Sequence, residues 1–413
     1  MCETFDIYMK SFFNTLSTIA CLVFVTLYLT GNVSEPSGNN VVVDTAPETI
    51  RLVFAGDVMG HETQLKGAWY EGGNNYYNFT STFQWVKEYI SSADIAVANF
   101  EVTLAGEPYT GYPAFSSPVS LAEALRDAGF NLFVTANNHI LDRGTKGLES
   151  TVDALDRLQI KHTGSFKDSV RWKTSYPLMI DKNGFRLAYL NYTYATNMST
   201  ARPPYIVNYL DTIRIAADIA NAYAENADFI IACLHWGEEY QNKENDTQRQ
   251  IATFLAKNGV NLIVGSHPHA VQPIKKIPAP ARPNSNIPLP PYIPLPPYLS
   301  ADTASKGELG EMGCDSVLVA YSLGNFVSNQ RWRYSDGGIL LEVTLTKNDG
   351  IVSLASWRYE PLWVYRYPEK DVQIYRIIPV LDYLSNPEHY PAISPEDEKL
   401  LIQFYNDTKK IIN

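Results

Sequence analysis

The sequence has few of the residues that define several protein classes. It holds only seven histidines and four cysteines in 413 residues, and no run of lysine or arginine. The formal net charge is -11, so the chain lacks the basic face that nucleic-acid binding requires. The four cysteines have no metal-ligand spacing and are too few for a disulfide framework. We therefore expect no nucleic-acid partner and no cysteine-based scaffold.

The composition is typical of a folded globular protein. Hydrophobic residues make up 45% of the chain and charged residues 19%, which excludes disorder, collagen and coiled coil as the main architecture. A chain of this length buries a sizeable core. One large domain, or one domain with an added lobe, is therefore expected.

An uncharged apolar run lies near the N-terminus, from Phe12 to Leu29, and a polar stretch follows it. The run is close to the lower limit for a spanning helix and long for a signal-peptide core. We interpret residues 1–31 as an uncleaved membrane anchor or a cleaved signal peptide, and residues 32–48 as a linker. Both alternatives place the rest of the chain in the cell envelope, outside the inner membrane.

Beyond the linker, apolar runs that indicate buried strands alternate with amphipathic helical patterns. The predicted strands are 50–55, 94–98, 131–135, 185–191, 228–234, 261–264, 316–321, 338–345 and 351–359. This alternation predicts a layered α/β domain over residues 49–365. Residues 366–413 are expected to form a C-terminal extension that contains a helix at 395–412.

One predicted helix has recognisable ends. Ser120 and Glu123 have the spacing of a capping box, and Leu121 and Leu125 share one face. Gly129 occupies the place where a glycine commonly ends a helix. The pattern therefore predicts a helix that begins at Ser120 and ends before Gly129.

A proline-rich segment is expected over residues 278–312. Nine of the 25 prolines lie between residues 278 and 297, where Ile-Pro-Leu-Pro-Pro-Tyr occurs twice. Proline lacks the backbone donor that a sheet interior needs, which favours an extended surface insertion between two strands. A recognition segment for a proline-binding partner is the alternative.

Side chains of metal-ligand type follow five of the predicted strands. They are Asp57 with His61; Asn99 with Glu101; Asn137, Asn138, His139 and Asp142; His235; and His267 with His269. A single Asp or Asn at such a place commonly caps a helix, and a single His commonly makes a structural hydrogen bond. Strand carboxyl ends in an α/β sheet converge on one edge, so five such groups together favour a functional site.

The combination of oxygen and imidazole ligands suits Mn, Fe, Zn, Mg or Ca better than copper or an iron-sulfur cluster. More ligands are available than one ion requires. The sequence therefore predicts two divalent metal ions bridged by a carboxylate, an arrangement that stabilises attacking and leaving oxygens in a displacement.

Several motifs together resemble the CapA family, the poly-γ-glutamate capsule synthesis proteins. They are Gly56-Asp57-Val58-Met59, Asn99-Phe100-Glu101, Ala136-Asn137-Asn138-His139 with Leu141-Asp142-Arg143-Gly144, His235-Trp236-Gly237, Gly265-Ser266-His267-Pro268-His269 and Ser322-Leu323-Gly324-Asn325-Phe326. They span about residues 50–345. That family is itself similar to calcineurin-like metallophosphoesterases. The resemblance implies a four-layer αββα sandwich with a dinuclear metal site.

The resemblance also implies a role for each matching residue. Asp57 and His269 would hold one ion, Asn138, His235 and His267 the other, and Glu101 would bridge the two. His139 would contact the substrate and protonate the leaving group, and Asp142 would orient it.

Two positions depart from the phosphoesterase pattern. Met59 stands where those enzymes have a histidine, and Glu101 stands where they have an aspartate. Both are compatible with the CapA pattern, but they count against ordinary phosphatase activity. His61 is a candidate replacement ligand, Asn325 is a candidate pocket residue, and Arg143 is a candidate anion clamp or a surface salt-bridge residue.

The sequence thus predicts an exported, metal-dependent protein of poly-γ-glutamate capsule or cell-surface polymer biosynthesis, which hydrolyses a phosphoester or an amide. Its expected partners are an anionic polymer or phosphoester substrate, the membrane through the N-terminal segment, and a capsule synthase complex. One alternative is a metallophosphoesterase of nucleotides or phosphosugars. Another is a non-catalytic module that uses its metals to fold or to bind polymer for export.

Overall fold

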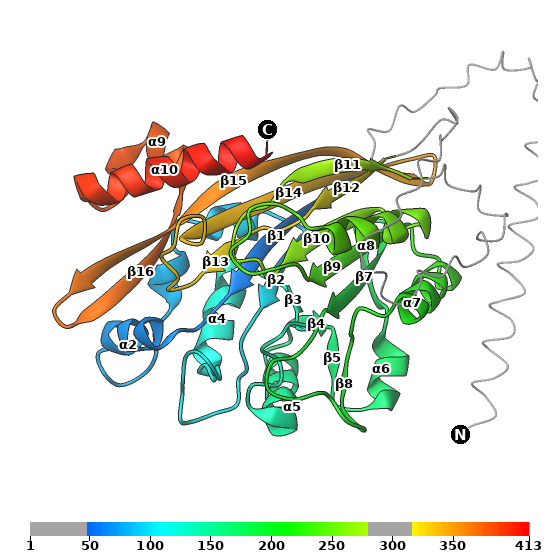
Figure 1. The fold of residues 1–413 in the computed structure, drawn as a ribbon, viewed down its shortest axis with the longest axis horizontal. Helices are drawn as coiled ribbons and strands as arrows, with labels where there is room; N and C mark the ends of the chain where they lie inside the picture. Colours follow the sequence, from blue (N-terminus) through cyan, green and yellow to red (C-terminus); the bar gives the residue numbers. More distant parts are fainter. Residues whose placement is uncertain (1–47, 280–315, 413) are drawn as a thin grey trace, which may run out of the picture. The chain divides into compact units, whose positions relative to one another are not determined.

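The structure, a computed structural model, describes residues 48–279 and 316–412 (Figure 1). Across these residues no helix is both long enough and apolar enough to cross a membrane. The segments predicted at 1–31 and 32–48, except for residue 48, lie outside the described residues. So does the proline-rich insertion, except for its first two residues. The strands that flank that insertion pair with each other in antiparallel register.

Two mixed β-sheets form the centre of the described chain. The larger sheet has the order β16-β15-β14-β1-β2-β3-β4, with β13 also paired to β1, and the smaller has the order β11-β12-β10-β9-β7-β6. The strands of the larger sheet are β1 (Glu48–Val58), β2 (Ile95–Phe100), β3 (Leu132–Val134), β4 (Lys161–Thr163), β13 (Asn325–Val327), β14 (Gly337–Asn348), β15 (Ile351–Glu369) and β16 (Val372–Pro379). Those of the smaller sheet are β6 (Leu178–Lys182), β7 (Phe185–Thr193), β9 (Phe229–His235), β10 (Leu262–Ser266), β11 (Ile274–Pro278) and β12 (Ser316–Ala320). A separate pair is formed by β5 (Ser165–Phe166) and β8 (Ile206–Val207).

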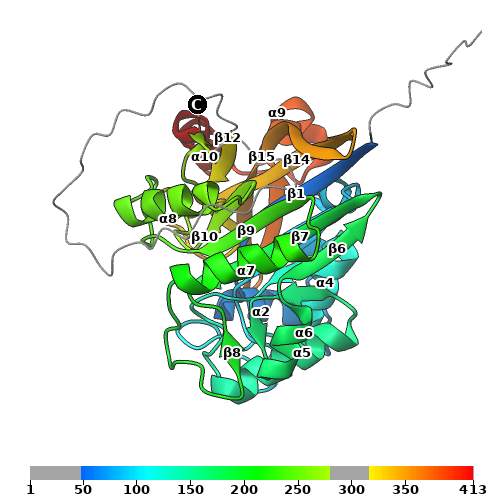
Figure 2. The same ribbon diagram turned by 90° about the vertical axis from the view of Figure 1, so that its right-hand side faces the viewer.

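Most of the described helices lie on the outer sides of the two sheets, and α9 and α10 lie at the C-terminal end of the chain (Figure 2). They are α2 (Glu62–Glu71), η1 (Thr80–Phe83), α3 (Lys87–Ser91), α4 (Val119–Ala128), α5 (Gly144–Arg157), α6 (Ser169–Ser175), α7 (Thr212–Ala224), α8 (Asp246–Lys257), α9 (Val380–Ser385), η2 (Pro387–His389) and α10 (Pro395–Ile412). Residues of α2 to α5 pack on the larger sheet, whereas residues of α7 and α8 pack on the smaller one.

The alternation of side chains along β1 shows why the layers form. Val53 and Ala55 pack in the cluster that includes α4 and α5. Leu52 and Phe54 point to the opposite face, where they pack with residues of β7, β9 and β10. Because successive side chains of a strand face opposite sides, a fully apolar strand is stable only between two covered layers. The predicted four-layer αββα sandwich is confirmed.

The larger sheet extends past the predicted domain boundary at residue 365. β15 continues to Glu369, and β16 pairs with it antiparallel from Val372. The predicted C-terminal helix is present as α10, and its Leu401 and Phe404 pack with Trp363 of β15. Part of the expected extension, residues 366–379, therefore belongs to the sheet.

The capping box predicted at Ser120 is wrong. Helix α4 begins at Val119 with Pro118 as its N-cap residue, and the start has no side-chain cap. The Ser120 hydroxyl is buried and has no partner in the part of the chain that the structure describes. Pro118, whose φ is -68°, holds the extended N-cap position, so the helix begins one residue before Ser120. The other end is as predicted, because Gly129 closes the helix in the left-handed region at φ 117°.

The sheet topology brings distant strand ends together. Strands β1, β2 and β3 run parallel, as do β7, β9 and β10. At the end of β1 the chain passes so close to Gly324 that a Cβ atom on Gly56 would lie 1.9 Å from the Gly324 carbonyl oxygen. The missing side chain lets the Asp57 amide donate to that oxygen over 3.0 Å. The carboxylate of Asp57 is thereby placed between the two sheets.

Candidate metal centre

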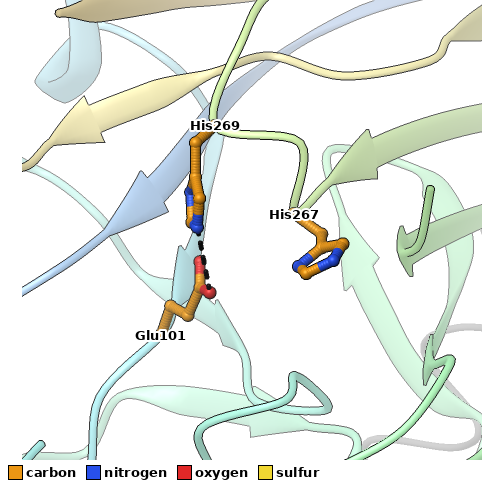
Figure 3. Close-up of side chains that lie close together, drawn as sticks. All are labelled: Glu101, His267 and His269. Carbon is orange, nitrogen blue, oxygen red and sulfur yellow. Dashed lines mark ion pairs between the residues drawn. The ribbon is translucent and has the colours of Figure 1, made fainter. Parts of the chain in front are cut away.

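Two overlapping groups of buried side chains could hold metal ions. The first consists of Asp57, Glu101 and His235, and the second of Glu101, His267 and His269, with ligand atoms within 4.8 Å of one another in each. Figure 3 shows the Glu101 carboxylate pointing toward the ring of His269, with His267 beside them. Glu101 is common to both groups. That is the place where the sequence analysis expected the bridging carboxylate.

The two groups overlap, so the assignment of each histidine to one ion stays a prediction. His235 lies with Asp57 in the first group, and His269 Nδ1 also lies 2.9 Å from Asp57. Asn138 joins these ligands, because its Oδ1 lies 2.9 Å from His235 Nε2.

Asp57 is fully buried at the end of β1. Its carboxylate accepts hydrogen bonds from His269 Nδ1 over 2.9 Å and from Asn99 Nδ2 over 2.7 Å. Burial raises the pKa of Asp57, but His269 and Asn99 stabilise the charged form more strongly, so the pKa lies below its ordinary value. The other ring nitrogen of His269, Nε2, lies 3.9 Å from Glu101 Oε1.

Glu101 follows β2 and is completely buried. Its Oε1 lies 3.5 Å from His235 Nε2 and 4.0 Å from His139 Nε2, yet it has no hydrogen-bond partner among the described residues. Burial and the charge of Asp57 raise the pKa of Glu101 well above its ordinary value. A carboxylate in this setting needs a positive charge to stay ionised.

His235 and His267 provide buried neutral imidazoles. His235 is the last residue of β9, and burial together with the charges of neighbouring histidines lowers its pKa well below the ordinary value. Burial lowers the pKa of His267 to about 3. Both side chains are therefore unprotonated at neutral pH, the form in which imidazole binds metals.

The turn after β10 is held in an unfavourable conformation. His267 has φ 99° and His269 has φ 55°, values that non-glycine residues rarely adopt. The amide side chain of Asn325 helps to hold the turn, because its Nδ2 lies 3.3 Å from the His269 carbonyl oxygen. Backbone strain of this kind is concentrated at functional sites.

These residues fit divalent ions. Three buried polar atoms at the centre have no hydrogen-bond partner in the described chain: Glu101 Oε1, His267 Nδ1 and Asn138 Nδ2. Leaving a buried polar atom unpaired costs stability, so such atoms call for a ligand. The carboxylate oxygen and the imidazole nitrogen are of the ligand type for Mn, Fe or Zn.

His139 and Asp142 form a tight pair beside the carboxylates. His139 Nδ1 donates to Asp142 Oδ2 over 2.7 Å, and the same oxygen accepts the Phe115 amide over 2.9 Å. The Phe115 ring packs edge-on against the imidazole, with ring centroids 4.7 Å apart. The pairing directs His139 Nε2 toward Glu101, as expected for an oriented proton donor.

His61 lies outside both ligand groups of the described chain. Its Nδ1 lies 3.0 Å from Gln64 Oε1 and 3.3 Å from the Asn329 amide, at the start of α2. Burial lowers the pKa of His61 to about 4. His61 is the N-cap residue of α2, and its role as a replacement ligand stays a prediction.

Arg143 lies at the start of α5, where its guanidinium donates to Thr110 Oγ1 over 3.4 Å. Within the described chain no carboxylate lies within 4.0 Å of it, so it makes no salt bridge there. Its role as an anion clamp stays a prediction.

Two residues at the centre had no assigned role in the sequence analysis. Asn99 Nδ2 lies 3.2 Å from His235 Nδ1 while it also contacts Asp57, so it links the two sheets. Tyr194 follows β7, and its ring lies 4.6 Å from that of His267. Asn99 stood among the strand-end residues, but a tyrosine after a strand carries no metal-ligand signal. Burial and the charges of Glu239 and Glu101 raise the pKa of Tyr194 to about 12.

Comparison with known proteins identifies the family. The family described as bacterial capsule synthesis protein PGA_cap matches residues 51–330, which include every residue of the metal centre. The chain belongs to this family. The matched range contains the strand-end residues from Asp57 to Asn325.

Two relatives in this family are similar over most of the chain. The "PGA biosynthesis protein CapA" of Bacillus subtilis (strain 168) is 25% identical over 310 residues, which cover 73% of this chain and 69% of that protein. The "Capsule biosynthesis protein CapA" of Bacillus anthracis is 26% identical over 320 residues, which cover 73% of this chain and 65% of that protein. The chain therefore spans slightly less than two thirds of the second relative.

The comparison with solved structures finds distant similarity to several proteins. NAD nucleotidase NadN of Haemophilus influenzae has a TM-score of 0.41 at 11% identity, covering 88% of this chain and 60% of its own. The calcineurin-like phosphoesterase YfkN of Bacillus subtilis has a TM-score of 0.42 at 13% identity. That match covers 88% of this chain and 98% of the YfkN chain. A phosphatase from Mycoplasma pneumoniae has a TM-score of 0.39 at 14% identity. That match covers 82% of this chain and 97% of the phosphatase chain.

Proposed function

We propose that the chain is a metal-dependent hydrolase of capsule or cell-surface polymer biosynthesis that cleaves a phosphoester or an amide, with poly-γ-glutamate or a related anionic polymer as its substrate. The observation that carries the proposal is Glu101, a buried carboxylate that belongs to both ligand groups and has an unpaired oxygen. Membership of the capsule synthesis family supports the biological setting.

The side chains of the centre would hold two divalent ions, with Glu101 between them. Asp57, His235, His267, His269 and Asn138 supply the remaining ligands. Bound ions would supply Lewis-acid charge and lower the pKa of water. Asn99 and Asp142 orient the carboxylate and imidazole groups from behind, as outer partners of metal ligands do.

His139 is the proposed general acid. In hydrolysis, a water oxygen forms a bond to phosphorus or to the carbonyl carbon, and the bond to the leaving oxygen or nitrogen breaks. The leaving atom takes the proton of His139 Nε2. The attacking water loses a proton to the solvent, and the solvent reprotonates His139 after turnover. The Asp142 carboxylate on Nδ1 stabilises the imidazolium before the transfer.

The apolar run from Phe12 to Leu29 supports placement of the protein in the cell envelope, anchored or exported. The named relatives, both capsule biosynthesis proteins, favour a capsule synthase complex as the partner.

A second candidate function is hydrolysis of nucleotide or phosphosugar esters. The rings of Tyr240 and Trp332 favour it, because their centroids lie 4.9 Å apart and the residues are exposed to 39% and 61%. The Tyr240 ring also lies 6.0 Å from that of His269. Exposed aromatic rings next to a polar site can stack on a planar ring of a ligand.

Metal analysis combined with hydrolysis assays tests the proposal. The purified protein should bind about two ions per chain and hydrolyse a γ-glutamyl polymer or bis(4-nitrophenyl) phosphate. A Glu101→Gln variant should lose metal and turnover while it stays folded. The matched Glu149→Gln variant, which changes a carboxylate on α5 that accepts from Tyr205, should keep both. Turnover that survives Glu101→Gln would refute the site. A preference for nucleoside or sugar phosphates would support the second candidate.

A further inference from the structure

Tyr194 is fixed to the metal centre by its backbone. It follows directly on β7, whose Thr193 lies opposite His235 of β9 in register. The Tyr194 amide donates to the His235 carbonyl oxygen over 3.0 Å. Three residues later, the Asn197 amide donates to the Asn138 carbonyl oxygen over 2.8 Å. The segment after β7 is therefore hydrogen-bonded to two ligand-bearing segments.

The ring of Tyr194 covers the imidazoles on one side and is open on the other. It lies 4.6 Å from the His267 ring and, nearly parallel, 6.4 Å from the His235 ring. The residue is still 43% exposed. Tyr192, two residues earlier, is by contrast completely buried, and its hydroxyl donates to Asp218 over 2.9 Å. The side chain of Tyr194 is thus partly exposed beside buried imidazoles, whereas that of Tyr192 is not.

We propose that Tyr194 is a further catalytic residue, whose phenol O–H donates a hydrogen bond to a non-bridging phosphoryl oxygen, or to the carbonyl oxygen, of the substrate held at the metal centre. The inference rests on the proposed hydrolase function. A phenol is a neutral donor at physiological pH. It adds no charge to the site, and the stacked ring holds it in place, so the donor is in position before charge develops on the substrate oxygen.

The first test compares Tyr194→Phe with Tyr205→Phe in the full-length, metal-loaded protein. Tyr205 lies on the same connection between β7 and α7, and its hydroxyl donates to Glu149. Loss of one preorganised donor lowers turnover by about 10²- to 10³-fold. We expect that loss in kcat/KM for Tyr194→Phe, with metal content and Tm unchanged, and wild-type values for Tyr205→Phe. A Tyr194→Phe variant with wild-type kcat/KM would overturn the inference.

Substrates with different leaving groups distinguish the role of the Tyr194 hydroxyl from that of His139. A hydrogen bond to a non-bridging oxygen should be worth the same for 4-nitrophenyl and alkyl phosphodiesters. A loss that grows with the pKa of the leaving group would make Tyr194 an acid, and the inference would fail.

A second measurement does not depend on turnover. Inorganic phosphate should bind the metal-loaded Tyr194→Phe protein about tenfold more weakly than the wild type in calorimetry, the size expected for one hydrogen bond to a charged ligand. Equal affinities would overturn the inference. If the wild type binds phosphate in a Tyr194-dependent way but hydrolyses none of the substrates, the proposed function fails and the oxygen contact of Tyr194 stands.

Discussion

The metal centre and the C-terminal segment of residues 380–412 differ in whether their buried polar atoms have hydrogen-bond partners. Three polar atoms at the centre are buried without a partner, including Glu101 Oε1 and His267 Nδ1. Within residues 380–412, no described buried side-chain nitrogen or oxygen lacks a partner. There Asn386 donates to Asp382 over 2.9 Å, and Ser394 donates to Asp397 over 2.9 Å.

The difference distinguishes a region built to bind from a region built to be stable. Unpaired buried groups, and backbone strain at His267 and His269, raise the free energy of the folded protein. They are tolerated where a ligand later satisfies them. Polar groups in the C-terminal segment are satisfied within the fold, so changes there should affect stability and leave chemistry alone.

The largest effect is expected at His139. Replacing His139 with Ala removes the proposed general acid and should lower kcat by about 10²- to 10⁴-fold, more for poor leaving groups than for 4-nitrophenol. Asp142→Asn should cause a smaller loss. Metal content should be unchanged in both. The control is His162→Ala. His162 lies on the edge strand β4, where its side chain contacts Asp156 of α5 and lies outside both ligand groups of the described chain. Equal losses for all leaving groups would contradict the assignment.

A smaller effect is expected for Glu101→Gln in the metal-free protein. Most mutations lower stability, but this one should raise it. The raised pKa of Glu101 means that its contribution to stability is fully present below the ordinary value of 4.5 and is lost as pH rises through the raised pKa. Gln does not titrate. In EDTA at pH 8, Glu101→Gln should therefore melt about 1 °C above the wild type, the shift that about 1 kcal/mol produces in a chain of 413 residues.

At pH 4.5 this difference between Glu101→Gln and the wild type should shrink. Excess Mn²⁺ at pH 8 should reverse it, because only the wild type gains stability from bound ions. Thermal unfolding followed by circular dichroism measures both comparisons. A metal-free wild type that is more stable than Glu101→Gln at pH 8 would refute the view of Glu101 as an uncompensated buried charge.

The smallest effect is expected in the C-terminal segment. Ser394 precedes α10, and its Oγ accepts the Asp397 amide over 3.1 Å, as an N-cap residue does. Ser394→Ala should cost about 1 kcal/mol of stability. It should leave kcat, KM and metal content unchanged. Any loss of metal in this variant would refute the view that the C-terminal segment affects stability without affecting metal binding.

Most of the strands that carry the centre were predictable from the sequence. β1, β2, β9 and β10 are buried on both faces, and each appears in the sequence as a continuous apolar run. β16 was missed, because Arg376 interrupts its apolar pattern. That arginine is tolerated because Glu71 of α2 lies opposite and accepts from its guanidinium over 3.1 Å. Such a partner, far away in the chain, leaves no local signal.

The candidate ligands were predictable for the same reason, because each follows a buried strand. His61 illustrates the limit: it has the right residue type and lies four positions after Asp57, yet it caps α2. Tyr194 illustrates the reverse, since only the pairing of β7 with β9 places it against the imidazoles.

The sequence by itself determined that oxygen and imidazole side chains stand at the ends of buried strands, because the apolar runs and the residues after them are contiguous in the chain. The tertiary structure alone decided which of these side chains meet. Asp57 and His269 are 212 positions apart, and their hydrogen bond exists because the two sheets pack face to face. The same packing left Glu101 Oε1 unpaired, and an unpaired atom is a property of the surroundings that no local pattern encodes.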